Sequence, residues 1–169
     1  GSYQLNCLSK PQYILNVMEG LNSPVLWMDI DSKIHKSLEI YDQFDESVDV
    51  VASTANNQLS GVKASPLYFG NTEKSKDFLR SWIQTTKDII EHKMGIFDHE
   101  PLFEVVRIYN DKINMRYVGV EYCTWPGYAN ENTCITMGLA DSETKKESLR
   151  SLGFKEDFIE WQSPGDKQP

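Results

Sequence analysis

The sequence predicts a single α/β domain in which a mixed central β-sheet is flanked by helices. Short apolar runs typical of buried strands alternate along the chain with segments whose apolar residues recur at helical spacing. The chain has 169 residues, 40% of them hydrophobic and 25% charged, which is enough to bury one core of ordinary composition. We expect residues 3–161 to form this domain and residues 162–169 to be a flexible tail.

The first expected element is a helix that starts at Pro11. Proline suits the first helical turn, because its missing N–H is not needed there. The residues that follow at helical spacing, and that we expect to face the core, are Ile14, Val17, Met18 and Leu21.

The next element is an apolar strand, within Ser23-Pro24-Val25-Leu26-Trp27-Met28, that ends in Asp29-Ile30-Asp31. In an extended chain, side chains alternate, so Asp29 and Asp31 would point one way and Ile30 back into the sheet. Two such carboxylates at the carboxyl end of a strand suit a hard divalent cation and a phosphate ester. The bare pattern is weak in an Asp-rich chain, and a solvated strand end or an Asx-turn is the alternative.

The remaining elements continue the alternation. Further strands are expected over 48–52, 64–69 and 113–120, from their apolar runs or period-two patterns. A long helix is expected from Asn71-Thr72, with buried Phe78, Leu79, Trp82, Ile83, Ile89 and Ile90. Another helix should open at Asp98 and bury Leu102, Val105 and Val106, and a last one should span 142–152.

Charge and cysteine usage exclude several classes of protein. A net charge of −8 argues against binding to nucleic acid or to an anionic membrane surface. The sequence contains neither an apolar run of the roughly 18 residues that a membrane span needs nor a signal peptide. The three cysteines, Cys7, Cys123 and Cys134, lack CxxC spacing and suggest reduced thiols in a cytoplasmic protein.

Four segments between residues 10 and 153 resemble a known family. The first is Lys10-Pro11 with the strand that leads to Asp29-Ile30-Asp31. The second is Ala64-Ser65-Pro66-Leu67-Tyr68-Phe69-Gly70-Asn71-Thr72, followed by Phe78-Leu79-Arg80-Ser81-Trp82. The third and fourth are Phe97-Asp98-His99-Glu100-Pro101-Leu102-Phe103 and Cys134-Ile135-Thr136-Met137-Gly138-Leu139. In this order they resemble the nucleotide-diphospho-sugar transferases, glycosyltransferases of the GT-A fold.

The resemblance implies a metal-dependent glycosyltransferase. Its donor would be a nucleoside-diphosphate sugar, with a UDP-sugar favoured, and its acceptor a hydroxyl of a glycan or glycoprotein. Mn²⁺ or Mg²⁺ would be held by Asp31, while Asp29 shares the ion or holds the ribose. Lys10, Ser65 and Asn71 would complete the donor side.

The resemblance also implies an acceptor side. If the reaction inverts the anomeric centre, a carboxylate must take the proton of the acceptor hydroxyl, and Asp98 and Glu100 are the candidates. Both also suit plain capping of a helix amino terminus. His99 and Trp125 are candidates for binding the acceptor, and the alternatives are an exposed His99 and a packed loop at Trp125.

Two departures from the family and two rival functions stay open. Only 28 residues precede Asp29, so the unit that holds the nucleotide base is short, and Met137 stands where many relatives have a metal-binding His. Both departures favour a degenerate sugar-nucleotide-binding or glycan-binding module of the same fold. A phosphatase of the haloacid-dehalogenase type also begins with Asp-x-Asp after a strand. That type needs a Thr or Val two residues further on, whereas Asp31 is followed by Ser32-Lys33-Ile34.

Overall fold

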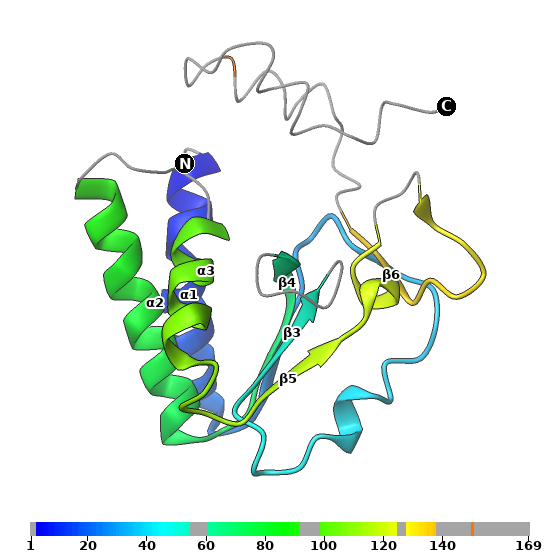
Figure 1. The fold of residues 1–169 in the computed structure, drawn as a ribbon, viewed down its shortest axis with the longest axis horizontal. Coiled ribbons are helices and arrows are strands. Elements are labelled where there is room, and N and C mark those ends of the chain that lie inside the picture. The colour runs from blue at the N-terminus through cyan, green and yellow to red at the C-terminus, as the bar shows by residue number, and fades with distance from the viewer. Residues whose placement is uncertain (1–2, 55–60, 92–98, 125–127, 138–149, 151–169) are drawn as a thin grey trace.

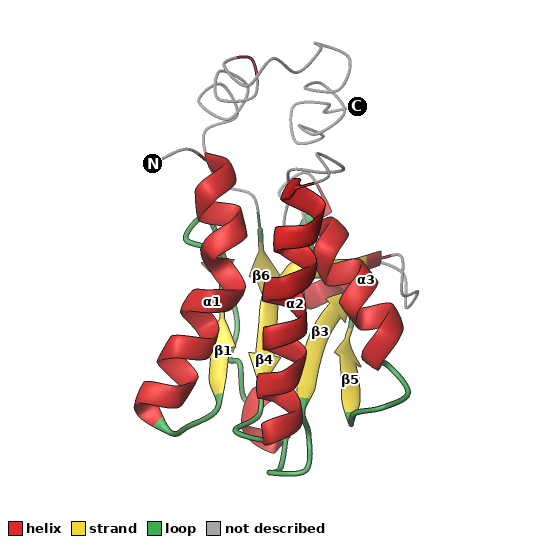
Figure 2. Ribbon diagram, turned by 90° about the vertical axis from the view of Figure 1, so that its left-hand side faces the viewer, coloured by secondary structure: helices red, strands yellow, loops and turns green. Residues whose placement is uncertain are grey.

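A computed structural model describes residues 3–54, 61–91, 99–124, 128–137 and 150, with side chains from residue 9 onward. In this part of the chain, three helices cover one face of a four-stranded mixed sheet (Figure 1, Figure 2). The predicted α/β architecture is therefore confirmed. The helices are α1 (Tyr3–Leu21), α2 (Glu73–Glu91) and α3 (His99–Tyr109), and the described residues also form the 3-10 helices η1 (Tyr41–Gln43) and η3 (Val120–Tyr122).

The four-stranded sheet has the order β1-β4-β3-β5. β4 (Val62–Phe69) is antiparallel to both β1 (Val25–Trp27) and β3 (Val50–Thr54), and β3 is parallel to β5 (Met115–Val118). As a result, the carboxyl ends of β1, β3 and β5 lie at the same end of the sheet, where open α/β sheets bind their ligands. A separate antiparallel pair is formed by β2 (Lys33–Ile34) and β6 (Ile135–Thr136).

The sheet has a hydrophobic cluster on each face. Alternation along β3 directs Val50 and Ala52 toward the helices and Val51 to the opposite side. The helix-side cluster includes Ile14, Met18, Leu67, Phe69, Phe78, Trp82, Leu102 and Val106. The smaller cluster on the other face is built from Tyr41, Val48, Val51, Tyr68 and Val118, with Leu26, Leu38 and Phe44 packed against it.

Helix α1 begins earlier than the sequence predicts. It starts at Tyr3, so Pro11 lies inside the helix and the prediction that it occupies the first turn is wrong. An internal proline removes one helical hydrogen bond, yet here Pro11 is buried beside Ile14 and Met18, whose packing against the sheet holds this part of the helix. Leu21 ends the helix and is 67% exposed, which contradicts its predicted place in the core.

Helix α2 begins close to the predicted position. The Thr72 hydroxyl accepts the Ser75 N–H at 3.1 Å, as an N-cap does. Phe78, Leu79 and Trp82 are buried as expected. The buried stripe ends at Thr86, so Ile90 in the last turn is exposed, against the prediction.

The later helices are only partly described. α3 buries Leu102, Val105 and Val106, as predicted, but Asp98 lies outside the described residues. The helix predicted over 142–152 also lies outside them, apart from Arg150. Cys123 and Cys134 are buried free thiols. Within the described ranges, the protein contains no helix with the length and apolar character that crossing a bilayer requires.

Candidate functional site

The segment after β1 turns instead of staying extended. β1 ends at Trp27, and the Asp29 carbonyl accepts the N–H of Ser32 at 3.1 Å, which closes a turn. Ile30 occupies the middle of this turn and is fully exposed. The prediction that Ile30 points into the sheet is therefore wrong, because the alternation of an extended strand does not apply within a turn.

Asp29 is held from three elements, which contact its carboxylate and its backbone N–H. Lys10 Nζ, on α1, lies 2.9 Å from Asp29 Oδ1, and Trp27 Nε1, on β1, donates to the same oxygen at 2.9 Å. Lys10 also donates to the Ala64 carbonyl, on β4, at 3.3 Å and lies 5.8 Å from the centre of the Trp27 ring. The Asp29 backbone N–H donates to Ser65 Oγ at 2.8 Å. These contacts fix the Asp29 carboxylate at the carboxyl end of β1.

Burial explains why this pair forms. The Lys10 side chain is 7% exposed and that of Asp29 is 34% exposed. A buried ammonium group is stable only with a compensating charge and hydrogen bonds, and Asp29 and the Ala64 carbonyl supply both. The Lys10 ammonium group thus neutralises the charge of Asp29, and the negative charge of this turn comes mainly from Asp31.

The late segment reaches the same place. Ser32 Oγ donates to Met137 Sδ at 3.3 Å, and Ser65 Oγ lies 3.9 Å from the same sulfur atom. The pairing of β2 with β6, which sets Lys33 opposite Thr136, brings Met137 here. A thioether is a poor ligand for a hard cation, so Met137 packs beside the turn without offering a metal ligand of its own.

Asp31 is the half-exposed carboxylate of the turn. No hydrogen bond or ion pair to this side chain comes from the described residues. Across the described ranges, no three His, Cys, Asp or Glu side chains come together as a metal-binding group. The residues present therefore fit a hard cation only if ligand and water oxygens complete its coordination shell.

The structure does not bring Asn71 to this group. Val25 pairs with Phe69 and Trp27 with Leu67, so β4 runs away from Asp29 toward the start of β1. Asn71 follows β4 and donates to Asn22 Oδ1 at 3.1 Å. Five residues lie between Ser65 and Asn71, and the strand that Ser65 belongs to ends at Phe69, so Asn71 lies beyond the opposite end of β4. The structure therefore places Asn71 at the end of β4 that lies away from Asp29.

The predicted acceptor side is only partly described. Glu100 and His99 are exposed in the first turn of α3. Figure 1 shows that α3 descends toward the start of β5, so its first turn lies at the end of the sheet where β1, β3 and β5 finish. Asp98 and Trp125 lie outside the described residues.

The sequence did not predict two neighbours of the site, Ser32 and His35. Ser32 contacts Met137, and His35 Nε2 lies 2.6 Å from Thr136 Oγ1 in the adjacent β2–β6 pair. Their position depends on the pairing of segments about a hundred residues apart, and only their closeness to Asp31 in the sequence could have signalled it.

Comparison of the sequence with models of protein families found no match, and comparison with curated proteins found none either. The residues that bear on function are therefore those that meet at the carboxyl end of β1. These residues are Lys10, Trp27, Asp29, Ser65 and Met137, with Asp31 in the adjoining turn.

Proposed function

We propose that the protein is a metal-dependent glycosyltransferase of the GT-A type. It would transfer a hexose or deoxyhexose from a nucleoside diphosphate, with UDP favoured, to a hydroxyl of a glycan or glycoprotein. The observation that supports this best is the meeting of Lys10, Asp29 and Ser65 at the carboxyl end of β1. Open α/β sheets bind phosphate-bearing ligands at this end.

Asp31 is the proposed protein ligand of Mn²⁺ or Mg²⁺. Its half-exposed carboxylate has no partner among the described residues, so it is available to a cation that also binds diphosphate and water oxygens. Such an ion, when bound, neutralises negative charge on the leaving diphosphate as a Lewis acid.

Asp29 takes a different role in this proposal. Its Oδ1 already receives Lys10 and the Trp27 indole, and its Oδ2 accepts a hydrogen bond from Lys10 at 3.3 Å, which makes it a weaker second metal ligand than a free carboxylate. We assign it the ribose, with Oδ2, which Lys10 also reaches, accepting a further hydrogen bond from a ribose hydroxyl. Ser65 is 3% exposed and accepts the Asp29 N–H, so we assign it to positioning Asp29.

The acceptor side rests on the first turn of α3. In an inverting reaction, Asp98 or Glu100 would take the proton of the acceptor hydroxyl. His99 and Trp125 would contact the acceptor. Two observations support this. Glu100 and His99 are exposed, and the first turn of α3 lies at the end of the sheet where β1 finishes.

A degenerate binding module of the same fold is the second candidate. The observation that favours it is the Met137 thioether, which lies beside Ser32 and Ser65 without the chemistry to bind a hard cation. Such a protein would bind a sugar nucleotide without cleaving it.

Release of free nucleotide from a panel of UDP-sugars and GDP-sugars tests the proposal. We expect Mn²⁺-dependent release that chelation abolishes and that Asp31→Asn lowers at least 100-fold, since loss of charge stabilisation in a transition state costs about 10²–10³ in rate. Asp111→Asn, an exposed carboxylate before β5, should keep full activity. Binding of a sugar nucleotide without release of free nucleotide would favour the degenerate module. Release that requires neither the metal ion nor Asp31 would contradict both candidate functions.

A further inference from the structure

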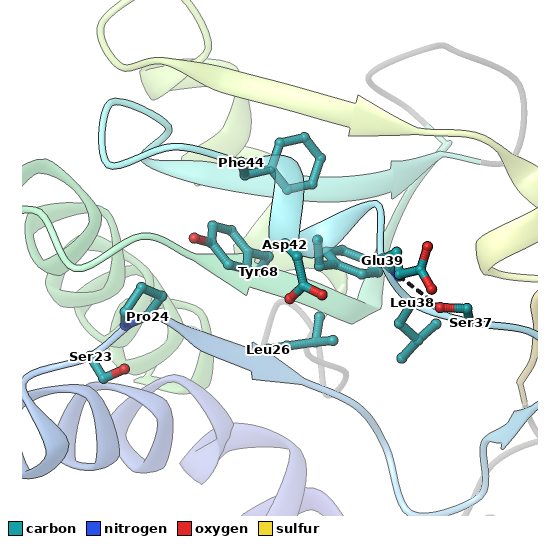
Figure 3. Close-up of a pocket in the computed structure, with 10 residues that line it drawn as sticks. Ser23, Pro24, Leu26, Ser37, Leu38, Glu39, Asp42, Phe44 and Tyr68 are labelled. Carbon is teal, nitrogen blue, oxygen red and sulfur yellow. Dashed lines mark hydrogen bonds between the residues drawn. The ribbon is translucent and has the colours of Figure 1, made fainter.

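A second concave site lies on the sheet face that the helices leave uncovered. A pocket of about 470 Å³ opens between β1, β4 and the segment 37–44 (Figure 3). This volume is in the range of small-molecule sites. Its lining residues are Ser23, Pro24, Leu26, Ser37, Leu38, Glu39, Tyr41, Asp42, Phe44 and Tyr68. None of them belongs to the group around Asp29. Ser23 and Pro24 precede β1, whereas Asp29 follows it, so these residues lie at opposite ends of the strand.

Among the described residues that line this pocket, every charged side chain is negative. Glu39 and Asp42 are exposed, and the lining contains no Lys, Arg or His. Neither carboxylate receives a hydrogen bond or an ion pair from the described residues. Figure 3 shows the Asp42 carboxylate projecting between Tyr68 and Leu26, with Glu39 further along beside Leu38 and Ser37. Apolar surface thus adjoins both acids.

A hydroxyl on a largely buried side chain also lines the pocket. Tyr68 is 8% exposed, and its hydroxyl has no hydrogen-bond partner in the part of the chain that the structure describes. Figure 3 shows this hydroxyl directed toward the end of the pocket at Pro24. The Tyr68 ring packs at 5.7 Å from that of Phe44, which fixes its direction. Burial raises the pKa of Tyr68, so the phenol stays protonated at neutral pH. A polar group that enters here could form a hydrogen bond with this hydroxyl, which has no protein partner among the described residues.

We propose that this pocket binds an organic cation that carries a primary ammonium group on an apolar stem. The two carboxylates attract the ammonium group and disfavour an anion, and the ring of the partly buried Phe44 adds cation–π attraction. Leu26 and Leu38 accept the apolar stem. The proposal does not depend on the proposed glycosyltransferase activity.

Two sources supply this chemistry: a free alkyl diamine and a lysine side chain of a peptide. Titration of 1,5-diaminopentane, followed by amide chemical shifts, should move the signals of residues 37–44 and leave Asp29 and Asp31 unmoved. The neutral diol 1,5-pentanediol, which is matched in length, should cause no such shifts. If a Gly-Lys-Gly peptide with blocked ends binds more tightly than the diamine, the natural ligand is a lysine side chain of a protein. If the diamine binds more tightly than the peptide, the natural ligand is a free amine.

Variants that each remove one negative charge distinguish binding in the pocket from general attraction of the diamine to an acidic protein. Asp42→Asn should weaken diamine binding about tenfold, whereas Glu46→Gln, which removes an exposed carboxylate outside the lining, should change it less than twofold. Tyr68→Phe should weaken binding severalfold and leave the fold intact. Equal weakening in Asp42→Asn and Glu46→Gln, or equal binding of the diol, would overturn the proposal. Binding of a neutral oligosaccharide at residues 37–44 without diamine binding would also overturn it.

Discussion

At the scale of single residues, the ion pair between Lys10 and Asp29 has the clearest energetic consequence. Removing one partner of a buried pair leaves an uncompensated charge, which costs about 3–5 kcal/mol when burial is complete. The Asp29 side chain is 34% exposed, so water screens part of that cost. We expect Lys10→Met to lower the free energy of unfolding by about 2 kcal/mol in urea titrations.

Two further variants control this prediction. Lys76→Met breaks a pair with Glu73, whose side chain is 75% exposed, and should cost less than about 1 kcal/mol. The double variant Lys10→Met/Asp29→Asn should recover part of the loss, because no unpaired charge remains. Equal losses in Lys10→Met and Lys76→Met would mean that the Lys10–Asp29 pair is not a buried ion pair in solution.

A second prediction at this scale concerns pH. Burial raises the pKa of the Cys123 thiol to about 11, and the nearby Lys63 offsets this in part. Because the folded-state pKa lies above the unfolded value, the protonated thiol stabilises the fold below about pH 9, and this contribution is lost as the pH rises toward 11. The free energy of unfolding should therefore fall over this window, and less steeply in Cys123→Ala. Identical slopes would exclude Cys123 as the cause.

At the scale of elements, Asp49 joins three of them. It is 3% exposed, its Oδ1 accepts the Thr72 hydroxyl at 2.5 Å, and its Oδ2 accepts the Asn114 N–H at 2.8 Å. It thereby links the start of β3 to the start of α2 and to the turn before β5. Hydrogen bonds to a charged acceptor contribute about 1.5–3 kcal/mol each.

Asp49→Ala should accordingly lower the free energy of unfolding by about 3 kcal/mol, with urea titration as the measurement. Asp77→Ala, which removes an exposed carboxylate that pairs with Arg80 on α2, should change it by no more than about 0.5 kcal/mol. If the two variants cost the same, the Asp49 contacts do not hold these elements together.

Element types were predictable from the sequence, but several boundaries were not. The strand at 64–69 and the buried stripe of α3 follow directly from apolar patterns. Pro11 lies inside α1 because tertiary packing outweighed the local preference of proline for a first turn. The role of Asp49 was missed because a single acidic residue inside an apolar run gives no sign of its partners in α2 and before β5.

At the scale of the whole molecule, strand direction decides which predicted site residues can act together. Lys10, Asp29 and Ser65 come from three elements and meet, because β4 runs antiparallel to β1 and starts beside its carboxyl end. Asn71 lies beyond the far end of β4. The sequence predicts each of these residues as a candidate. Only the strand order and register show that Lys10, Asp29 and Ser65 lie together and that Asn71 lies apart from them.

A pair of variants tests this separation. Ser65→Ala removes the hydroxyl that accepts the Asp29 N–H and should weaken UDP binding severalfold in calorimetric titrations. Asn71→Ala should leave UDP affinity unchanged within about twofold, although it loses the contact with Asn22. Weakening by Asn71→Ala alone would place the nucleotide at the opposite end of the sheet from Asp29.

The most direct test of the central claim is calorimetric titration of UDP with and without Mn²⁺, into the wild-type protein and into Asp31→Ala. The account predicts UDP binding that requires Mn²⁺ and that is lost in Asp31→Ala, since the ion needs the Asp31 carboxylate to bridge protein and diphosphate. UDP binding of equal strength in the variant, or no binding to the wild-type protein under either condition, would contradict it.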